Sequence, residues 1–198
     1  MKVNATEIDQ LLVPLTSYFK KDSFTRKEVN ENPPLRSELY SKEQMEQHAQ
    51  QLALSHALSV KDSPELLLKD LSDNEEILFQ VNELLKNSVK EKKSISPAAE
   101  WLLDNFYLIE EQIIIGKRYL PKGYSKGLPK LTNGLPRVYD LAIEIISHSD
   151  GHIDIQSLSN FITSYQKESD LTLGELWAIP IMLRLALLEN LSRVAARI

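Results

Sequence analysis

The sequence predicts an all-α fold, an irregular bundle of about seven or eight helices that carries one long basic loop. Apolar residues recur at intervals of three and four along almost the whole chain, which is the period of an amphipathic helix, and few segments alternate as strands do. Helix-start signals occur at several places. A length of 198 residues, 42% of them apolar, is enough to bury a core of ordinary size.

The first 40 residues are expected to form an N-terminal helix and an extended connector, separate from a helical domain over residues 41–198. Apolar residues at helical spacing predict an amphipathic helix over residues 4–20. Pro33 and Pro34 disfavour helix and favour extended geometry in the connector that follows.

Side-chain caps define the remaining helices. A hydroxyl or carboxylate just before a helix accepts a hydrogen bond from a free amide of the first turn. The predicted caps are Ser41, Ser63, Asp73, Ser96, Asp154 and Thr172. Helices are therefore predicted over residues 41–58, 64–70, 73–92, 97–116, 136–148, 154–168 and 172–197.

The last predicted helix is expected to be largely buried, because its polar stripe covers only about a third of its circumference. The stripe holds Glu175, Glu189, Arg193 and Arg197. The opposite, apolar face holds Trp177, Ile181, Leu188 and Leu191. Pro180 should kink this helix. No Gly or Pro stops the helix before Arg197, so we expect the chain to be a truncated module of a longer protein.

One charge falls in the apolar arc of each of two central helices. Glu110 lies at the edge of the apolar face of the 97–116 helix, and Arg184 lies in the middle of the apolar face of the last helix. A buried charge is costly unless it is paired and hydrogen-bonded. We therefore predict an ion pair between Arg184 and a carboxylate of the 97–116 helix, with Glu110 as the first candidate. The alternative is that Arg184 extends to the surface.

A basic loop rich in Pro and Gly joins the 97–116 helix to the next one. Its cations, with no carboxylate among them, are Lys117, Arg118, Lys122, Lys126, Lys130 and Arg137. Such a surface could bind phosphates, anionic lipid headgroups or an acidic face of a partner domain. The alternative is a structural loop that packs over its own domain. Evenly spread apolar residues favour packing, and they are Leu120, Leu128, Leu131 and Leu135.

No catalytic residue is predicted. The chain has no cysteine and none of the common nucleophile, phosphate-loop, dinucleotide or zinc-protease motifs. Glu110 and Glu111 are the adjacent carboxylates in an apolar setting, but neighbours on a helix point about 100° apart. They do not converge on one substrate as glycosidase carboxylates must.

The histidines do not predict a metal site. His148 and His152 lie four residues apart, but Asp150-Gly151 should break the helix between them, so a solvent-exposed helix end is expected. His48 and His56 form no evident constellation. The longest run with few charges, residues 176–188, spans 13 residues and contains an arginine, which is too short to cross a bilayer.

Three stretches resemble the N-terminal region of the bacterial cyclic β-1,2-glucan synthases. They are PLRSELYSKEQMEQHAQQLALSH, then SPAAEWLLDNFYLIEEQIIIGKRYLPKGYSKGLPKLTNGLPRVYDLA, and finally DLTLGELWAIPIMLRLALLENLSRVAARI. The similarity covers roughly residues 33–58 and 96–198. Members of that family are very long inner-membrane enzymes that use UDP-glucose to build and cyclise a β-1,2-glucan. Their catalytic and transmembrane regions all follow the part matched here.

The resemblance implies a cytosolic helical module that packs against, positions or regulates the glycosyltransferase at the inner membrane. It implies no catalytic residue and no cofactor in this segment. The implied partners are other domains of the same polypeptide. From the residues themselves, the basic loop adds anionic lipid headgroups as one alternative, and the net charge of −5 disfavours nucleic acid. Two alternatives from other classes remain, which are a free-standing helical interaction protein and a small all-helical enzyme.

Overall fold

The structure of the chain, a computed structural model, describes residues 33–59 and 64–198. Within these ranges it contains seven α-helices, one short 3-10 helix and no β-strand, which confirms the all-α prediction. The elements are α3 (Lys42–Ser55), α4 (Leu66–Lys90), α5 (Pro97–Asp104), α6 (Phe106–Tyr119), η1 (Tyr124–Gly127), α7 (Arg137–Ser149), α8 (Ile155–Gln166) and α9 (Leu173–Ala195). The helix expected over residues 4–20 lies outside the described residues.

Four of the predicted caps are present. The side chains of Ser41, Ser96, Asp154 and Thr172 each accept a hydrogen bond from the amide three residues later. At Ser41 and Thr172 the returning bond from Gln44 and Glu175 completes a capping box. These starts are fixed by local chemistry, which is why the sequence predicts them well.

Two predicted boundaries are wrong. Asp73 was expected to cap a new helix, but α4 continues through it, because buried residues repeat at helical spacing on both sides, from Leu67 to Leu85. The predicted 97–116 helix is instead divided into α5 and α6 at Asn105. The Asn105 side-chain amide donates to the Trp101 carbonyl at 2.8 Å, so the side chain engages the turn in which the helix is interrupted. The expected cap Ser63 lies outside the described residues.

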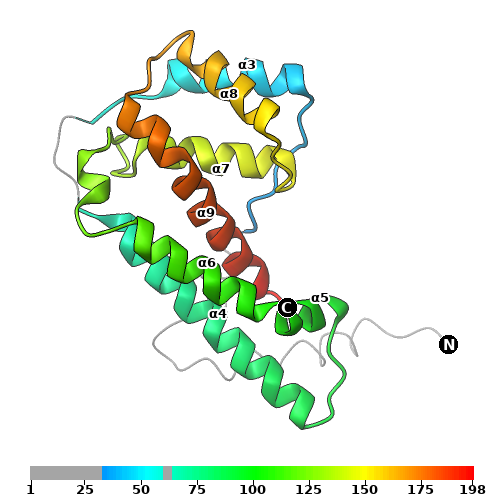
Figure 1. Cartoon of the computed structure of the whole chain (residues 1–198). Coiled ribbons are helices and arrows are strands. Elements are labelled where there is room, and N and C mark those ends of the chain that lie inside the picture. The colour runs from blue at the N-terminus through cyan, green and yellow to red at the C-terminus, as the bar shows by residue number, and fades with distance from the viewer. Residues whose placement is uncertain (1–32, 60–63) are drawn as a thin grey trace.

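The helices form three layers, which are α3 with α8, then α7 with α9, and then α4 with α5 and α6 (Figure 1). Helices α3 and α8 lie side by side and cover one side of α7, which packs on α9. On the other side, α9 contacts α4 and α6, which also pack on each other, and α5 sits at the end of that pair. Helix α9 therefore lies between the two outer layers and contacts helices from both halves of the sequence.

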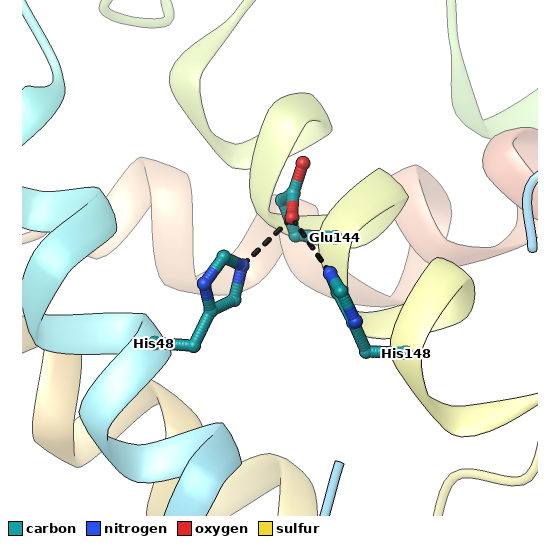
Figure 2. A group of neighbouring side chains, drawn as sticks. All are labelled: His48, Glu144 and His148. Carbon is teal, nitrogen blue, oxygen red and sulfur yellow. Dashed lines mark hydrogen bonds and ion pairs between the residues drawn. The ribbon is translucent and has the colours of Figure 1, made fainter. Parts of the chain in front are cut away.

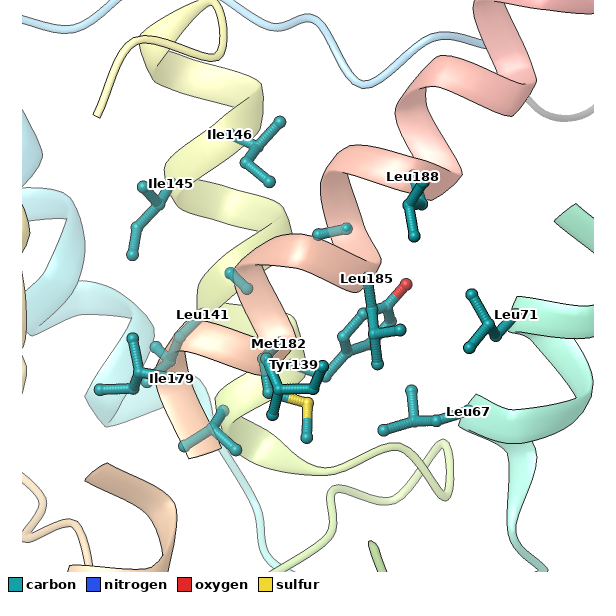
Figure 3. Packing of buried hydrophobic residues seen from close by; sticks show 14 of the residues in the cluster. Leu67, Leu71, Tyr139, Leu141, Ile145, Ile146, Ile179, Met182, Leu185 and Leu188 are labelled. Carbon is teal, nitrogen blue, oxygen red and sulfur yellow. The ribbon is translucent and has the colours of Figure 1, made fainter. Parts of the chain in front are cut away.

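The core is centred on α9. Met182 and Leu185 of α9 meet Tyr139 and Leu141 of α7 on one side and Leu67 of α4 on the other (Figure 3). Each such buried aliphatic side chain stabilises the fold by about 1.5–3 kcal/mol relative to leaving it exposed. Side chains of all three layers contribute to this one core.

The predicted apolar face of α9 is only partly correct. Ile181 and Leu188 are buried, but Trp177 is 73% exposed. The buried arc of α9 is centred on Ala178, Met182 and Leu185 and faces α7 and α4, so the tryptophan falls outside it. Among the described residues, none of the helices combines the length and the hydropathy that crossing a membrane requires.

Candidate functional site

The basic loop packs on its own domain. Ser59 donates its amide to the Lys130 carbonyl at 2.8 Å, and Arg137 donates its amide to the Pro129 carbonyl at 2.9 Å. Leu120, Leu128 and Leu131 are buried, which confirms the expectation that the apolar residues of the loop pack inward.

A carboxylate at the N-terminal cap position of α4 binds a turn of the loop. Gly123 has a left-handed backbone with φ of 86°, and its amide donates to Glu65 Oε1 at 2.7 Å. The hydroxyl of Ser125 donates to the same oxygen at 3.3 Å. Backbone amides in such turns can bind an external anion. Here the Gly123 amide binds the carboxylate of Glu65, which is an anion of the same domain.

Three of the six loop cations have partners inside the domain. Lys117 forms an ion pair with Glu75 of α4. Lys130 is 7% exposed, and its Nζ donates to the Pro64 carbonyl at 3.3 Å. Arg137 is buried in α7. Arg118, Lys122 and Lys126 are exposed, as is Lys117 in its ion pair. The structure therefore does not gather the six into one surface.

Arg137 and Glu175 form a buried ion pair between α7 and the first turn of α9. The guanidinium donates from Nε to Oε1 at 2.9 Å and from Nη2 to Oε2 at 2.8 Å. Arg137 is 3% exposed and Glu175 is 0% exposed. Burial opposes the charge of Arg137, but the hydrogen bonds and the charge of Glu175 outweigh it and raise the pKa of the guanidinium above its ordinary value.

Arg137 makes two further hydrogen bonds and lies near an aromatic ring. Its Nη1 donates to Ser169 Oγ at 2.9 Å, Nη2 donates to the Asp170 carbonyl at 3.0 Å, and its guanidinium carbon lies 5.8 Å from the centre of the Tyr165 ring. The sequence placed Arg137 in a surface loop and Glu175 in a polar stripe, and both assignments are wrong. The partners are 38 residues apart, so no local pattern joins them.

The expected partner of Arg184 is also corrected. Its Nε donates to the side-chain oxygen of Gln112 at 2.9 Å. Gln112 lies two positions after Glu110 on α6, so the prediction found the correct helix but not the correct residue. Arg184 is half-buried, and a neutral amide satisfies one of its donors at this depth.

A second group of polar side chains lies between α4, α7 and α9. Glu189 of α9 accepts hydrogen bonds from the Tyr139 hydroxyl and from Arg193. Burial, followed by the charges of Glu189 and Asp73, raises the pKa of Asp70 from its ordinary value to about 6. Burial and the charge of Glu189 also raise the pKa of Tyr139 well above its ordinary value.

The raised pKa of Asp70 predicts a stability effect. A carboxyl group whose pKa rises on folding adds stability below its unfolded pKa of 3.8, and this contribution is lost as the pH rises through about 6. We therefore expect Asp70→Asn to be more stable than the wild type by about 1–2 kcal/mol at pH 7.5 and equal to it near pH 4, after allowing for partial solvent screening.

Urea unfolding at both pH values measures this difference in stability. Asp104→Asn, an exposed aspartate of α5, is the control. A gain of the same size at both pH values would contradict the raised pKa.

Two histidines and a glutamate meet between α3 and α7, with Glu144 lying between the two imidazole rings (Figure 2). The Glu144 Oε2 atom lies 2.7 Å from His48 Nε2 and 3.5 Å from His148 Nε2. Within the part of the chain that the structure describes, this is the group of side chains whose ligand atoms converge enough to hold a metal ion, all within 4.8 Å of one another.

This cluster corrects the prediction made for the histidines. His148 is buried rather than exposed, and its ring stacks on Tyr40 with centroids 3.9 Å apart. His48, for which no partner was predicted, is a member of the cluster with Glu144 and His148. The sequence-based prediction considered His148 together with His152, across the end of α7. The partner of His148 in the structure is Glu144, which lies one turn earlier on the same helix.

A second histidine, His56, contacts α7 and α8 from the C-terminal end of α3. His56 Nδ1 lies 2.8 Å from the Tyr165 hydroxyl, and His56 Nε2 lies 3.1 Å from Asp140 Oδ2. Asp140 and Glu144 are one turn apart on α7, so two acidic residues of one helix bind His48 of α3 and His56, the residue that ends α3.

A cavity of about 180 Å³ lies beside the cluster, between α3, α7 and α8. Its lining combines apolar side chains with the polar groups of Tyr40, His148, Ser149 and His152. The buried hydroxyl of Ser149 has no hydrogen-bond partner among the described residues. His148 is therefore in contact with this cavity.

The fold and these contacts define an all-helical domain in which many charged groups form ion pairs and hydrogen bonds between its own segments. Over 129 residues, 64% of this chain, the sequence is 36% identical to the cyclic beta-(1,2)-glucan synthase NdvB of Rhizobium meliloti (strain 1021). The resemblance inferred from the sequence motifs is thereby confirmed, and the chain spans 5% of the length of that relative. No protein-family model matches the chain.

Proposed function

We propose that this chain acts as a non-catalytic helical module of a cyclic β-1,2-glucan synthase. In this role it packs against the glycosyltransferase region, on the cytoplasmic side of the inner membrane, and positions or regulates it. The observation that carries the proposal is the 36% identity to a segment of a protein named as such a synthase. Because the chain spans 5% of that relative, the rest of such a polypeptide supplies the surface against which it packs.

The use of charge inside the domain supports a structural role. The basic loop, which was the strongest binding candidate in the sequence, places Lys130 and Arg137 in the interior. Its turn at Gly123 binds Glu65 of the same domain. These groups stabilise the helical arrangement, and a module that positions another domain needs such a rigid scaffold.

An exposed apolar stripe on α9 is the proposed docking face. The stripe comprises Leu173, Trp177, Pro180, Leu187 and Val194, all exposed at intervals of three, four or seven residues. Such intervals place side chains on one face of a helix. Large apolar side chains grouped on a surface are typical of interaction sites. Trp177, at 73% exposure, is the most exposed of them and is the kind of residue that dominates binding energy at interfaces.

A chimeric synthase tests the proposal. The matched segment of the R. meliloti enzyme is replaced by this chain, and cyclic β-1,2-glucan is measured per mole of enzyme in membranes. We expect the chimera to make glucan and the doubly substituted Trp177→Glu, Leu187→Glu chimera to make about tenfold less, because two charges enter the docking face. The control is Ile155→Glu at the start of α8, which adds a charge at a residue that is 88% exposed and outside the stripe.

The free-standing interaction module is the alternative that the same stripe supports, since a separate protein could bind it equally well. The chimera separates the two readings. A chimera that makes wild-type amounts of glucan with and without the stripe substitutions would contradict docking to the synthase and favour a separate partner. Loss of glucan with Ile155→Glu as well would show that any added charge is harmful, and it would remove the stripe from the proposal.

A further inference from the structure

We propose that His48, Glu144 and His148 form a binding site for a divalent transition-metal ion of the zinc type. Two imidazoles and one carboxylate are a donor set that Zn²⁺ binds, with water completing four ligands. The sequence separates His48 from Glu144 by 96 residues, so the fold brings the ligands together. This site is independent of the proposed role in glucan synthesis.

The distances fit such an ion after small movements. Bonds of about 2.0–2.1 Å to a tetrahedral zinc place neighbouring ligand atoms about 3.3 Å apart. Here Glu144 Oε2 lies 2.7 Å from His48 Nε2 and 3.5 Å from His148 Nε2. All three ligand atoms lie within 4.8 Å of one another. Two of these separations therefore lie within about 0.6 Å of the coordinated value.

His148 is held in the orientation that a metal ligand needs. Its Nδ1 lies 2.7 Å from the Glu38 carbonyl oxygen, which only accepts, so Nδ1 carries the proton. In the neutral ring the lone pair then lies on Nε2 and points toward the Glu144 carboxylate, another acceptor. A metal cation between these two atoms would remove this repulsion, as would a second proton on the ring. Histidines that bind metals commonly donate their other nitrogen to a carbonyl in this way.

The surroundings also favour a bound ion. The stacked ring of Tyr40 fixes the plane of His148, and the ring of His48 meets that of His148 edge to face, with centroids 4.9 Å apart. His148 also lines the neighbouring cavity of about 180 Å³. A bound ion would tie α3 to α7 and would stabilise the contact between two layers.

The test uses the purified chain after metal removal. Zinc binding is measured by titration calorimetry, and cobalt(II) is added as a spectroscopic probe, because its visible absorption reports direct coordination. We expect one ion per chain. His48→Gln and Glu144→Gln should each weaken zinc binding by at least about 100-fold, the upper end of what loss of a residue outside the ligand set costs, and should abolish the cobalt spectrum. Both variants replace half-buried side chains by amides of similar size, and circular dichroism checks that they fold.

His152→Gln is the matched control, because His152 is an exposed histidine four residues from His148 and belongs to the cavity rim rather than to the cluster. Unchanged zinc binding in this variant, together with its loss in the other two, supports the site. The proposal is overturned if the wild-type chain binds no zinc with one-to-one stoichiometry. It is also overturned if His48→Gln and Glu144→Gln bind as the wild type does. Neither result bears on the synthase chimera.

Discussion

Glu175→Ala is expected to lower the free energy of unfolding by about 3–5 kcal/mol. The substitution leaves the guanidinium of Arg137, which is 3% exposed, without its buried counter-charge. Arg137 keeps the Ser169 hydroxyl and the Asp170 carbonyl as acceptors, but both are neutral. A buried charge with only neutral partners is destabilising, and this outweighs the direct loss of two hydrogen bonds.

Glu175 has a second role that adds to this loss. Its Oε2 atom accepts from the Thr172 amide at 2.8 Å and from the Thr172 hydroxyl at 3.0 Å. The carboxylate therefore completes the capping box of α9 while it binds Arg137 of α7. Removal of a helix cap costs about 1 kcal/mol by itself.

Urea unfolding followed by circular dichroism measures the effect. The matched control is Glu100→Ala, which removes an exposed glutamate from the first turn of α5 and should change stability by no more than about 0.5 kcal/mol. The double variant Arg137→Met, Glu175→Met should be less destabilised than Glu175→Ala, because no unpaired charge remains. A loss below about 1 kcal/mol in Glu175→Ala would show that the pair is hydrated in solution.

Lys130→Glu is expected to lower the free energy of unfolding by about 3 kcal/mol. The lysine is 7% exposed, and its Nζ donates to the Pro64 carbonyl. A carboxylate at this position cannot donate, and it would face a carbonyl oxygen inside the domain. The same segment of backbone is bonded to Ser59, so the loop cannot easily move away.

Lys126→Glu provides the matched comparison, because it makes the same charge change at an exposed lysine of the same loop. Its effect on stability should lie within about 0.5 kcal/mol. Similar small effects for both variants would contradict the packed loop. Lys122→Glu with Lys126→Glu tests the anion-binding alternative separately, since a site on the exposed part of the loop would lose affinity for phosphate or for anionic vesicles while the fold stays intact.

The parts of the fold that the sequence predicted are those controlled by neighbouring residues. Ser41, Ser96, Asp154 and Thr172 cap helices through atoms three positions away, so short motifs are sufficient to find them. Asp73 has the same local motif, but α4 continues through it, because tertiary burial on both sides outweighs a cap. Local signals therefore indicate where a helix can begin, and the core decides whether it does.

The contacts that the sequence missed join distant segments. Arg137 and Glu175 looked like surface charges because each lies in a polar stretch, and only the packing of α7 on α9 buries them together. In the histidine cluster, one signal was present, since Glu144 and His148 are four residues apart on one predicted helix. The third member, His48, could not be assigned without knowing that α3 lies against α7.

The central position of α9 has a consequence for how the domain comes apart. This helix contacts α7 on one side and both α4 and α6 on the other, and its side chains form the middle of the core (Figure 3). When α9 detaches, the helices on both sides lose their shared apolar partner at once. Denaturation should therefore be a single all-or-none transition, with the slowest-exchanging amides of α4 and α7 opening at the same free energy.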